Sequence, residues 1–121
     1  MAEHNEIGKK GEELAKNYLA KQGYRIQAIN WRFRKKELDL IAEKNNVLVV
    51  VEVKTRTSLY FENPKEAVTR RKQKFIIEAA EAYIVDNNIE METRFDIVEV
   101  TIINQKVEIE HIEDAFQPSL M

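Results

Sequence analysis

The chain contains 121 residues, of which 44% are hydrophobic and 33% are charged. This length and composition predict one domain, spanning residues 1–121, with a core of its own. Three glycines, two prolines and the absence of cysteine exclude collagen-like and low-complexity chains, disulfides and thiol catalysis. The longest run of large apolar residues, Val47–Val51, is far shorter than the roughly 20 residues of a membrane helix. The polar, charged N-terminus predicts no secretory signal, so we expect a cytoplasmic protein.

Charge is distributed unevenly along the sequence. Residues 32–74 contain twelve Lys or Arg and six Asp or Glu, whereas the remainder contains seven basic and fifteen acidic residues. A basic centre between acidic flanks favours a surface directed at a polyanion such as nucleic acid. Chance clustering on solvated faces explains the same pattern equally well, so charge alone does not decide between the two.

Hydrophobic periodicity predicts one helix, three strands, a second helix and two further strands. Asn45-Asn46 suits a two-residue turn with positive φ between the second and third strands. Pro64, after Asn63, suits the first position of the long second helix. Such a helix lets the next strand run parallel to an earlier one, so we expect an α/β fold with a mixed central sheet flanked by helices. The helices are predicted over 5–22 and 64–86, and the strands over 24–33, 36–43, 47–54, 93–103 and 106–112.

The hairpin of the second and third strands carries the most informative pattern. A two-residue turn fixes its register, so Asp39 lies opposite Glu52 and Glu37 lies opposite Lys54. Because side chains alternate along a strand, these four project from one face. The other face, which includes Leu38, is entirely apolar and is predicted to be core.

Two carboxylates at neighbouring positions across a hairpin repel each other. At about 5 Å and an effective dielectric of about 20, the repulsion is of order 3 kcal/mol. A divalent cation between Asp39 and Glu52 reverses the sign, and oxygen ligands suit Mg²⁺ or Mn²⁺. Lys54, two residues after Glu52, is placed to neutralise a phosphate oxygen or activate a water. The alternative is a solvated strand end with a Glu37–Lys54 ion pair.

Glu12 projects from the edge of the packed face of the first helix. It is either a further ligand beside the acidic pair, orienting a water or a second ion, or a flanking residue that reaches Lys9 or Lys16. Gly8 and Gly11 on the same helix allow its backbone to approach the sheet or a phosphate closely.

Basic residues before the acidic hairpin, after it, and at the second helix are candidates for gripping a phosphate backbone, although part of each cluster suits plain solvated surface. Trp31 is predicted to pack in the core, whereas Tyr60 and Phe61 fall in a predicted loop. Arg94 and Asp96 are expected to pair on the fourth strand, and the two histidines are assigned no role. The candidate nucleic-acid-binding residues are Arg32, Arg34, Lys35, Lys36, Arg56, Arg70, Arg71, Lys72 and Gln73.

Four separated blocks together resemble one known family. They read GKKGEELAKNYL at 8–19, NWRFRKKELDLIA at 30–42, VVVEVKTR at 49–56 and RFDIV at 94–98. Their order and spacing resemble the YraN-like family of small bacterial proteins, which is similar to the PD-(D/E)xK nuclease superfamily and its Holliday junction resolvases. The chain departs from the family pattern at Lys36, where a glycine is usual, and at Val50, where a phenylalanine is usual.

The resemblance implies a restriction-endonuclease-like αβββαββ core and a catalytic set. By that implication Asp39 is the first acid of the motif, Glu52 the second, Lys54 the lysine, and Glu12 a carboxylate from the first helix. Asp39, Glu52 and Glu12 would be the metal ligands for Mg²⁺ or Mn²⁺. The implied activity is a metal-dependent endonuclease-like phosphodiesterase acting on DNA, plausibly branched or structured, with RNA as a further partner and a homodimer expected by analogy.

Two other functions remain open from the sequence. The first is a non-catalytic nucleic-acid-binding module on a nuclease scaffold, whose binding would depend on salt but not on Asp39 or Glu52. The second is a protein-interaction domain, which would not bind nucleic acid near physiological salt.

Overall fold

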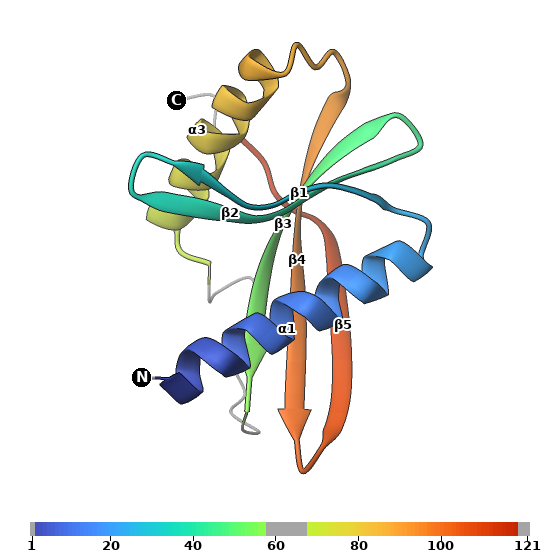
Figure 1. Cartoon of the computed structure of the whole chain (residues 1–121). Coiled ribbons are helices and arrows are strands. Elements are labelled where there is room, and N and C mark those ends of the chain that lie inside the picture. Colours follow the sequence, from blue (N-terminus) through green and yellow to red (C-terminus); the bar gives the residue numbers. More distant parts are fainter. Residues whose placement is uncertain (1, 58–67, 119–121) are drawn as a thin grey trace.

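A computed structural model describes residues 2–57 and 68–118, with side chains described from residue 6 onward. Its element order confirms the predicted α/β class, because a helix precedes three strands and a second helix precedes two more (Figure 1). The elements are α1 (Ala2–Lys21), β1 (Arg25–Phe33), β2 (Lys36–Lys44), β3 (Val47–Arg56), α3 (Arg70–Asp86), β4 (Glu92–Ile103) and β5 (Lys106–Phe116).

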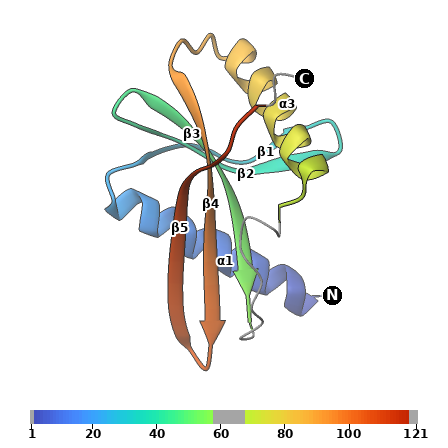
Figure 2. The ribbon, with the colours of Figure 1, turned by 180° about the vertical axis from the view of Figure 1, so that it is seen from behind.

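The five strands form one mixed sheet in the order β1-β2-β3-β4-β5. β3 and β4 are parallel, and every other neighbouring pair is antiparallel. The connection that contains α3 therefore returns the chain parallel to β3, as the sequence predicted. Figure 1 shows α1 crossing in front of β3, β4 and β5, and Figure 2 shows α3 on the opposite side of the molecule. Within the described residues, neither helix is both long enough and apolar enough to cross a membrane.

The predicted turn at Asn45-Asn46 is confirmed, with φ angles of 53° and 62°. The predicted register is also confirmed next to this turn, where Ile41 pairs with Val50 and Leu40 pairs with Val51. Pairing between β2 and β3 ends at Leu40–Val51, whereas β2 continues to pair with β1 as far as Lys36. The hairpin therefore opens at its far end, where the sequence placed the acidic residues.

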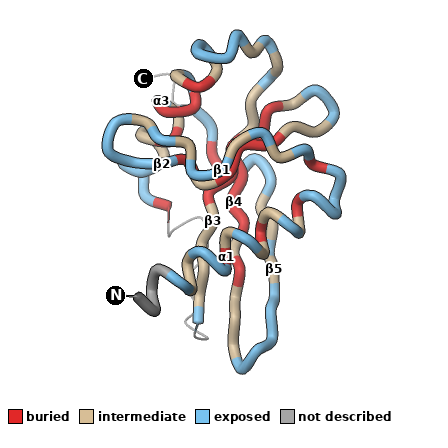
Figure 3. The backbone as a smooth tube through the Cα atoms, viewed as in Figure 1, coloured by how far each residue is buried: buried red, intermediate tan, exposed pale blue. Residues whose placement is uncertain are grey.

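Two apolar clusters form the core, one on each side of the sheet. One cluster packs β2–β5 against α3, and the other packs the same strands against α1 (buried backbone in red, Figure 3). Leu38 was predicted to share a face with Leu40, but it packs with Ile41 and Val50 on the α3 side. The alternation fails there because β2 is no longer held by β3 beyond Leu40 and follows its own twist.

Gly11 is the point of closest approach between α1 and the sheet. A Cβ built on Gly11 would lie 1.9 Å from Oγ1 of Thr55, whereas one built on Gly8 would meet nothing within 4 Å. The predicted close approach is therefore confirmed at Gly11 and is absent at Gly8. It brings the next residue of α1, Glu12, to the open end of the β2–β3 hairpin.

The second helix was predicted to run unbroken from Pro64, and this prediction is wrong within the described residues. Thr69 has extended backbone angles and is the N-cap of α3, accepting a hydrogen bond on Oγ1 from the backbone N of Lys72 at 3.2 Å. A threonine side chain competes with helical hydrogen bonding and so sets a start that the apolar pattern does not mark. Pro64 itself lies outside the described residues.

Candidate active site

Asp39 lies where β2 separates from β3, and its side chain takes over a backbone hydrogen bond. Oδ2 of Asp39 accepts a hydrogen bond from the backbone N of Val53 at 2.8 Å. The charge of the Glu52 carboxyl group raises the pKa of Asp39, so the two carboxyl groups lie close together. The two acids that the sequence predicted to be neighbours are therefore near each other, on two adjacent strands.

Two neighbouring, largely buried carboxyl groups cannot both be ionised at low cost. Burial, and then the charge of Glu52, raise the pKa of Asp39 to about 8, against the opposing hydrogen bond from Val53. The charge of Glu12 adds to the rise. At neutral pH the Asp39–Glu52 pair therefore holds a proton, which a divalent cation would have to displace.

Glu52 is the more deeply placed member of the pair, with a side chain that is 8% exposed. Its Oε2 forms an ion pair with Nζ of Lys72, whose own side chain is 53% exposed. Burial opposes the charged form of Lys72, but Glu52 outweighs it and raises the pKa of the ammonium. Lys72 was predicted to contact nucleic acid, and the structure shows it bound to an acid of the candidate site instead of free in solvent.

Glu12 on α1 lies close enough to Asp39 and Glu52 for their charges to interact. Within the described residues no ion pair joins it to Lys9 or Lys16, although all three line one small pocket. Burial raises the pKa of Glu12, a hydrogen bond with Asn30 opposes that rise, and the charges of Glu37 and Glu52 add to it. Lys16 forms its ion pair with Glu13 instead, at 3.3 Å. Glu12 is thus near enough to the pair to feel its charge while its carboxylate is held by an amide.

Lys54 follows Glu52 by two residues on β3, so the strand directs both side chains to the same side. Lys54 is half-buried. The alternative Glu37–Lys54 pair is not formed, because the β2–β3 ladder has already ended and Glu37 pairs with Arg32 at 3.6 Å. No carboxylate within residues 6–57 and 68–118 forms an ion pair with Lys54.

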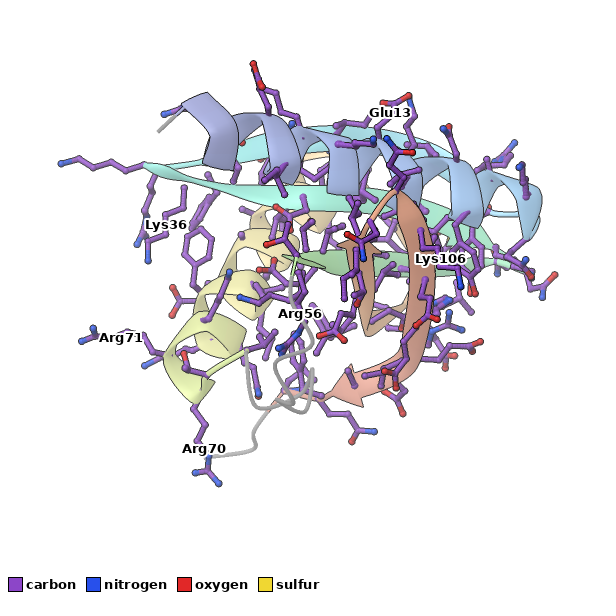
Figure 4. The ribbon with its side chains drawn as sticks, turned by 90° about the horizontal axis from the view of Figure 1, so that it is seen from below. Glu13, Lys36, Arg56, Arg70, Arg71 and Lys106 are labelled. Atoms are coloured by element: carbon purple, nitrogen blue, oxygen red, sulfur yellow. The ribbon has the colours of Figure 1, made fainter. Side chains whose placement is uncertain are left out.

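A groove of about 600 Å³ opens beside Glu52, between the start of β2 and the first turns of α3. Its walls are mainly basic, while Phe75 and Ile76 supply an apolar floor. Figure 4 shows Lys36, Arg70 and Arg71 on this side of the molecule. The lining residues are Lys35, Lys36, Glu37, Glu52, Thr69, Arg71, Lys72, Phe75 and Ile76.

The remaining candidates for nucleic-acid contact are distributed differently. Arg34 is exposed at the β1–β2 turn and lies over the ring of Phe33, 4.8 Å from its centroid. Arg56 is paired with Glu99, and its side chain is only 9% exposed. Gln73 donates from Nε2 to the backbone oxygen of Val68 at 3.0 Å, which helps to close the start of α3. These two side chains therefore serve the fold, whereas the groove collects the accessible lysines and arginines.

A divalent cation at this site would depend on carboxylate oxygens, which suit Mg²⁺ or Mn²⁺. No group of three or more acidic or histidine side chains in the described part of the chain converges as a ready-made metal site. Mg²⁺, however, is commonly held by one or two carboxylates together with waters and substrate phosphates. Asp39 and Glu52 supply two neighbouring carboxylates, and Glu52 lines a groove suited to phosphates. The residues present fit Mg²⁺ or Mn²⁺ in that mode.

A second polar cluster, which sequence reasoning did not assemble, lies on β4 and β5. Asp96 is fully buried and accepts hydrogen bonds from Arg94 at 2.8 and 2.9 Å. Nε2 of His111 lies 2.7 Å from Oδ2 of Asp96, and the backbone N of Asp114 lies 3.0 Å from Oδ1. Arg94 also donates to the hydroxyl of Tyr24 at 2.7 Å. The Arg94–Asp96 pair was predicted, but nothing in the local sequence marks His111 as its neighbour.

Of the aromatic residues Trp31, Tyr60 and Phe61, only Trp31 lies within the described part of the chain. Trp31 packs edge-on against Tyr83 with ring centroids 5.2 Å apart, which confirms its place in the core. Tyr60 and Phe61 lie outside the described residues.

The fold and the candidate site together define a class: α/β proteins whose mixed sheet opens at one hairpin to present two neighbouring carboxylates and a lysine beside a helix start. Sequence comparison then gives the family. The chain matches the uncharacterised protein family UPF0102 over residues 11–100 and belongs to it. The predicted YraN-like resemblance is thereby confirmed.

Several curated relatives match over nearly their full length. A UPF0102 protein of Flavobacterium psychrophilum is 47% identical over 116 residues, which cover 96% of this chain and 98% of the relative. Those of Phocaeicola vulgatus and Bacteroides thetaiotaomicron are each 48% identical, and each match covers 99% of both chains. The family match over residues 11–100 and the matches to these relatives include the two strands that carry Asp39 and Glu52.

Proposed function

We propose that this protein is a metal-dependent endonuclease-like phosphodiesterase that acts on DNA, with branched or structured DNA as the preferred form. The observation that carries the proposal is the neighbouring Asp39 and Glu52 carboxyl groups, of which Glu52 lines a basic groove. A buried acidic pair costs folding free energy, and a groove lined by lysine and arginine attracts phosphates. The two features at one place suit a cation bridging protein and phosphate.

In the proposed mechanism, Asp39 and Glu52 hold Mg²⁺ or Mn²⁺. The ion supplies Lewis-acid polarisation of a phosphate oxygen and makes a water more acidic. Lys54 stabilises the negative charge that grows on the phosphoryl oxygens during in-line attack. Glu12, held by Asn30 at the entrance from α1, orients the attacking water.

The groove residues bind the nucleic-acid backbone rather than its bases. Lys35, Lys36 and Arg71 lie on two sides of the same groove and carry flexible cationic side chains suited to phosphates. One chain offers one acidic pair, so we propose that two copies act together when both strands of a branched duplex are cut.

Cleavage of a panel of DNA substrates tests the proposal. The panel contains single-stranded, duplex, flap and four-way-junction DNA, incubated with Mg²⁺ or Mn²⁺. Wild type is expected to cut at least one structure, and Asp39→Asn and Lys54→Met are expected to lose at least about 100-fold in rate. Glu43→Gln is the matched control, because Glu43 lies on the same strand but pairs with Arg25 away from the groove. Equal rates in wild type and Asp39→Asn would refute the proposal.

A second candidate is a non-catalytic module that binds nucleic acid on the same scaffold. The observation that favours it is the ion pair by which Lys72 already neutralises Glu52. This candidate predicts salt-dependent DNA binding that survives Glu52→Ala, with no calorimetric signal for Mg²⁺ in wild type. A Mg²⁺ signal that disappears in Glu52→Ala favours the enzyme instead.

A further inference from the structure

The ion pair between Lys72 and Glu52 joins α3 to β3. Among the described residues, no other ion pair joins these two elements. Lys72 lies in the first turn of α3, three residues after the Thr69 N-cap, and Glu52 lies at the centre of β3. Both residues line the groove, and there the Lys72 ammonium is the cation paired with the Glu52 carboxylate.

The two partners differ sharply in their freedom to move. The Glu52 side chain is 8% exposed and is fixed by its strand, whereas the Lys72 side chain is 53% exposed on a flexible four-carbon stem. If the contact breaks, Lys72 can return to water at little cost, but Glu52 is left as a buried carboxylate beside Asp39. A buried anion without a partner is strongly unfavourable. The contact is therefore one that a competing cation can take over by displacing the lysine alone.

We propose that Lys72 is an internal counter-cation that holds the place of the divalent ion and is displaced when the ion binds. Once displaced, the ammonium extends along the groove wall toward Lys35, Lys36 and Arg71, where it contacts a substrate phosphate. This inference rests on the proposed function, because it assumes that Asp39 and Glu52 take a divalent ion. It adds that ion binding and phosphate binding are coupled through one lysine.

Coupling of this kind makes the affinity for the ion and the affinity for phosphate depend on each other. An ion that releases Lys72 raises the affinity for phosphate, and phosphate that captures Lys72 raises the affinity for the ion by the same factor. In the absence of DNA, Lys72 opposes the ion. Removing the charge of Lys72 therefore strengthens ion binding. Removing another groove lysine weakens only phosphate binding and leaves ion binding unchanged.

Titration calorimetry with Mn²⁺ and no DNA tests the proposal. Lys72→Met keeps the length of the side chain and removes its charge, and it is expected to bind Mn²⁺ about fivefold more tightly than wild type, the equivalent of a partly exposed ion pair. Lys72→Arg retains the competing charge and is expected to bind as wild type does. Lys74→Met is the matched control, since Lys74 is exposed on the same helix and is outside the set of residues that line the groove.

The outcomes separate this inference from the proposed function. If all four proteins bind Mn²⁺ and Lys72→Met binds with equal or weaker affinity than wild type, the displacement proposal is overturned while the metal site stands. If none binds Mn²⁺, the proposed function fails and the displacement proposal fails with it. Circular dichroism of each variant establishes that the affinities refer to folded protein.

Fluorescence anisotropy with labelled DNA gives a second readout. Ca²⁺ replaces Mn²⁺ so that the DNA remains intact during the measurement. In wild type, Ca²⁺ is expected to raise DNA affinity, because it frees Lys72 for a phosphate. In Lys72→Met the rise is expected to be smaller. An equal rise in both proteins would contradict the release of Lys72 toward the substrate.

Discussion

The Asp39 carboxyl group is central to the proposed site, and its burial beside Glu52 costs stability at neutral pH. Its pKa is raised to about 8 by burial and by Glu52. The unfolded chain ionises this group near pH 4, so the folded state binds one more proton across the interval between these values. The contribution of Asp39 to stability is therefore fullest below about pH 4 and is lost as the pH rises through about 8.

Replacement of Asp39 by Asn tests this cost. Asparagine resembles the protonated acid: its oxygen accepts from Val53 and its amide donates to Glu52. We expect Asp39→Asn to match wild type in free energy of unfolding near pH 4 and to exceed it by on the order of 2 kcal/mol at pH 8.5. Urea unfolding at both pH values measures the difference. A wild type that is as stable as the variant at pH 8.5 would show that the pair is not strained.

Ion binding is predicted to expel the proton that the pair shares. Because the pKa of Asp39 is about 8, uptake of Mn²⁺ at pH 7 should release about one proton, and the number should fall toward zero above pH 9. Calorimetry in buffers with different ionisation enthalpies counts the protons. Mn²⁺ binding without proton release at pH 7 would mean that the ion binds elsewhere.

Asp96 contributes in the opposite sense, through stability alone. Burial would raise its pKa, but hydrogen bonds from His111, Arg94 and the backbone of Asp114 outweigh burial and hold the pKa below the usual value. Its contribution is present above about pH 4 and is lost as the pH falls further. Asp96→Asn should cost about 3–5 kcal/mol at pH 7, because it leaves the half-buried Arg94 guanidinium without its buried carboxylate partner. Thermal unfolding measures this, and a loss below about 1 kcal/mol would contradict the assigned role.

At the scale of elements, the approach of α1 to β3 decides where Glu12 lies. A methyl group on Gly11 would lie 1.9 Å from Thr55 Oγ1, so Gly11→Ala should push α1 away from β3. We expect a loss of about 1–3 kcal/mol in unfolding free energy and weaker Mn²⁺ binding, because Glu12 moves with the helix. Gly8→Ala is the matched control. It meets nothing within 4 Å and should stabilise α1 by up to about 1 kcal/mol.

Element order and the hairpin were predictable because local rules fix them. Asn45-Asn46 requires positive φ at both turn positions, and that turn sets the register that brings Asp39 to Glu52. The start of α3 was not predictable from apolar spacing, because a single Thr69 hydroxyl ends the extended segment and caps the helix. The face of Leu38 was missed because strand alternation presumes a ladder that ends at Leu40.

At the scale of the whole molecule, the acidic pair was predictable but its charged surroundings were not. Asp39 and Glu52 are brought together within one hairpin, over a short stretch of chain. The Lys72–Glu52 and His111–Asp96 contacts join separate elements, and their formation depends on how α3 and β5 pack on the sheet. The members of such a cluster can be identified in the sequence only once the fold is known.

The fold also brings basic residues from separate parts of the sequence together on one surface. The basic segment of the sequence contributes both walls of one groove, from the start of β2 and the start of α3. Glu52 of the acidic pair lines that groove, unlike the surface acids of the flanks. The positive charge of the groove therefore lies beside the carboxyl pair that we propose as a cation site.

We propose that Asp39 and Glu52 together bind one divalent ion, and a crystal grown with Mn²⁺ is the decisive experiment. We predict an anomalous density peak in contact with both carboxylates, with the Lys72 ammonium withdrawn from Glu52. An ordered Asp39–Glu52 pair without a peak, still bound to Lys72 at saturating Mn²⁺, would contradict the claim.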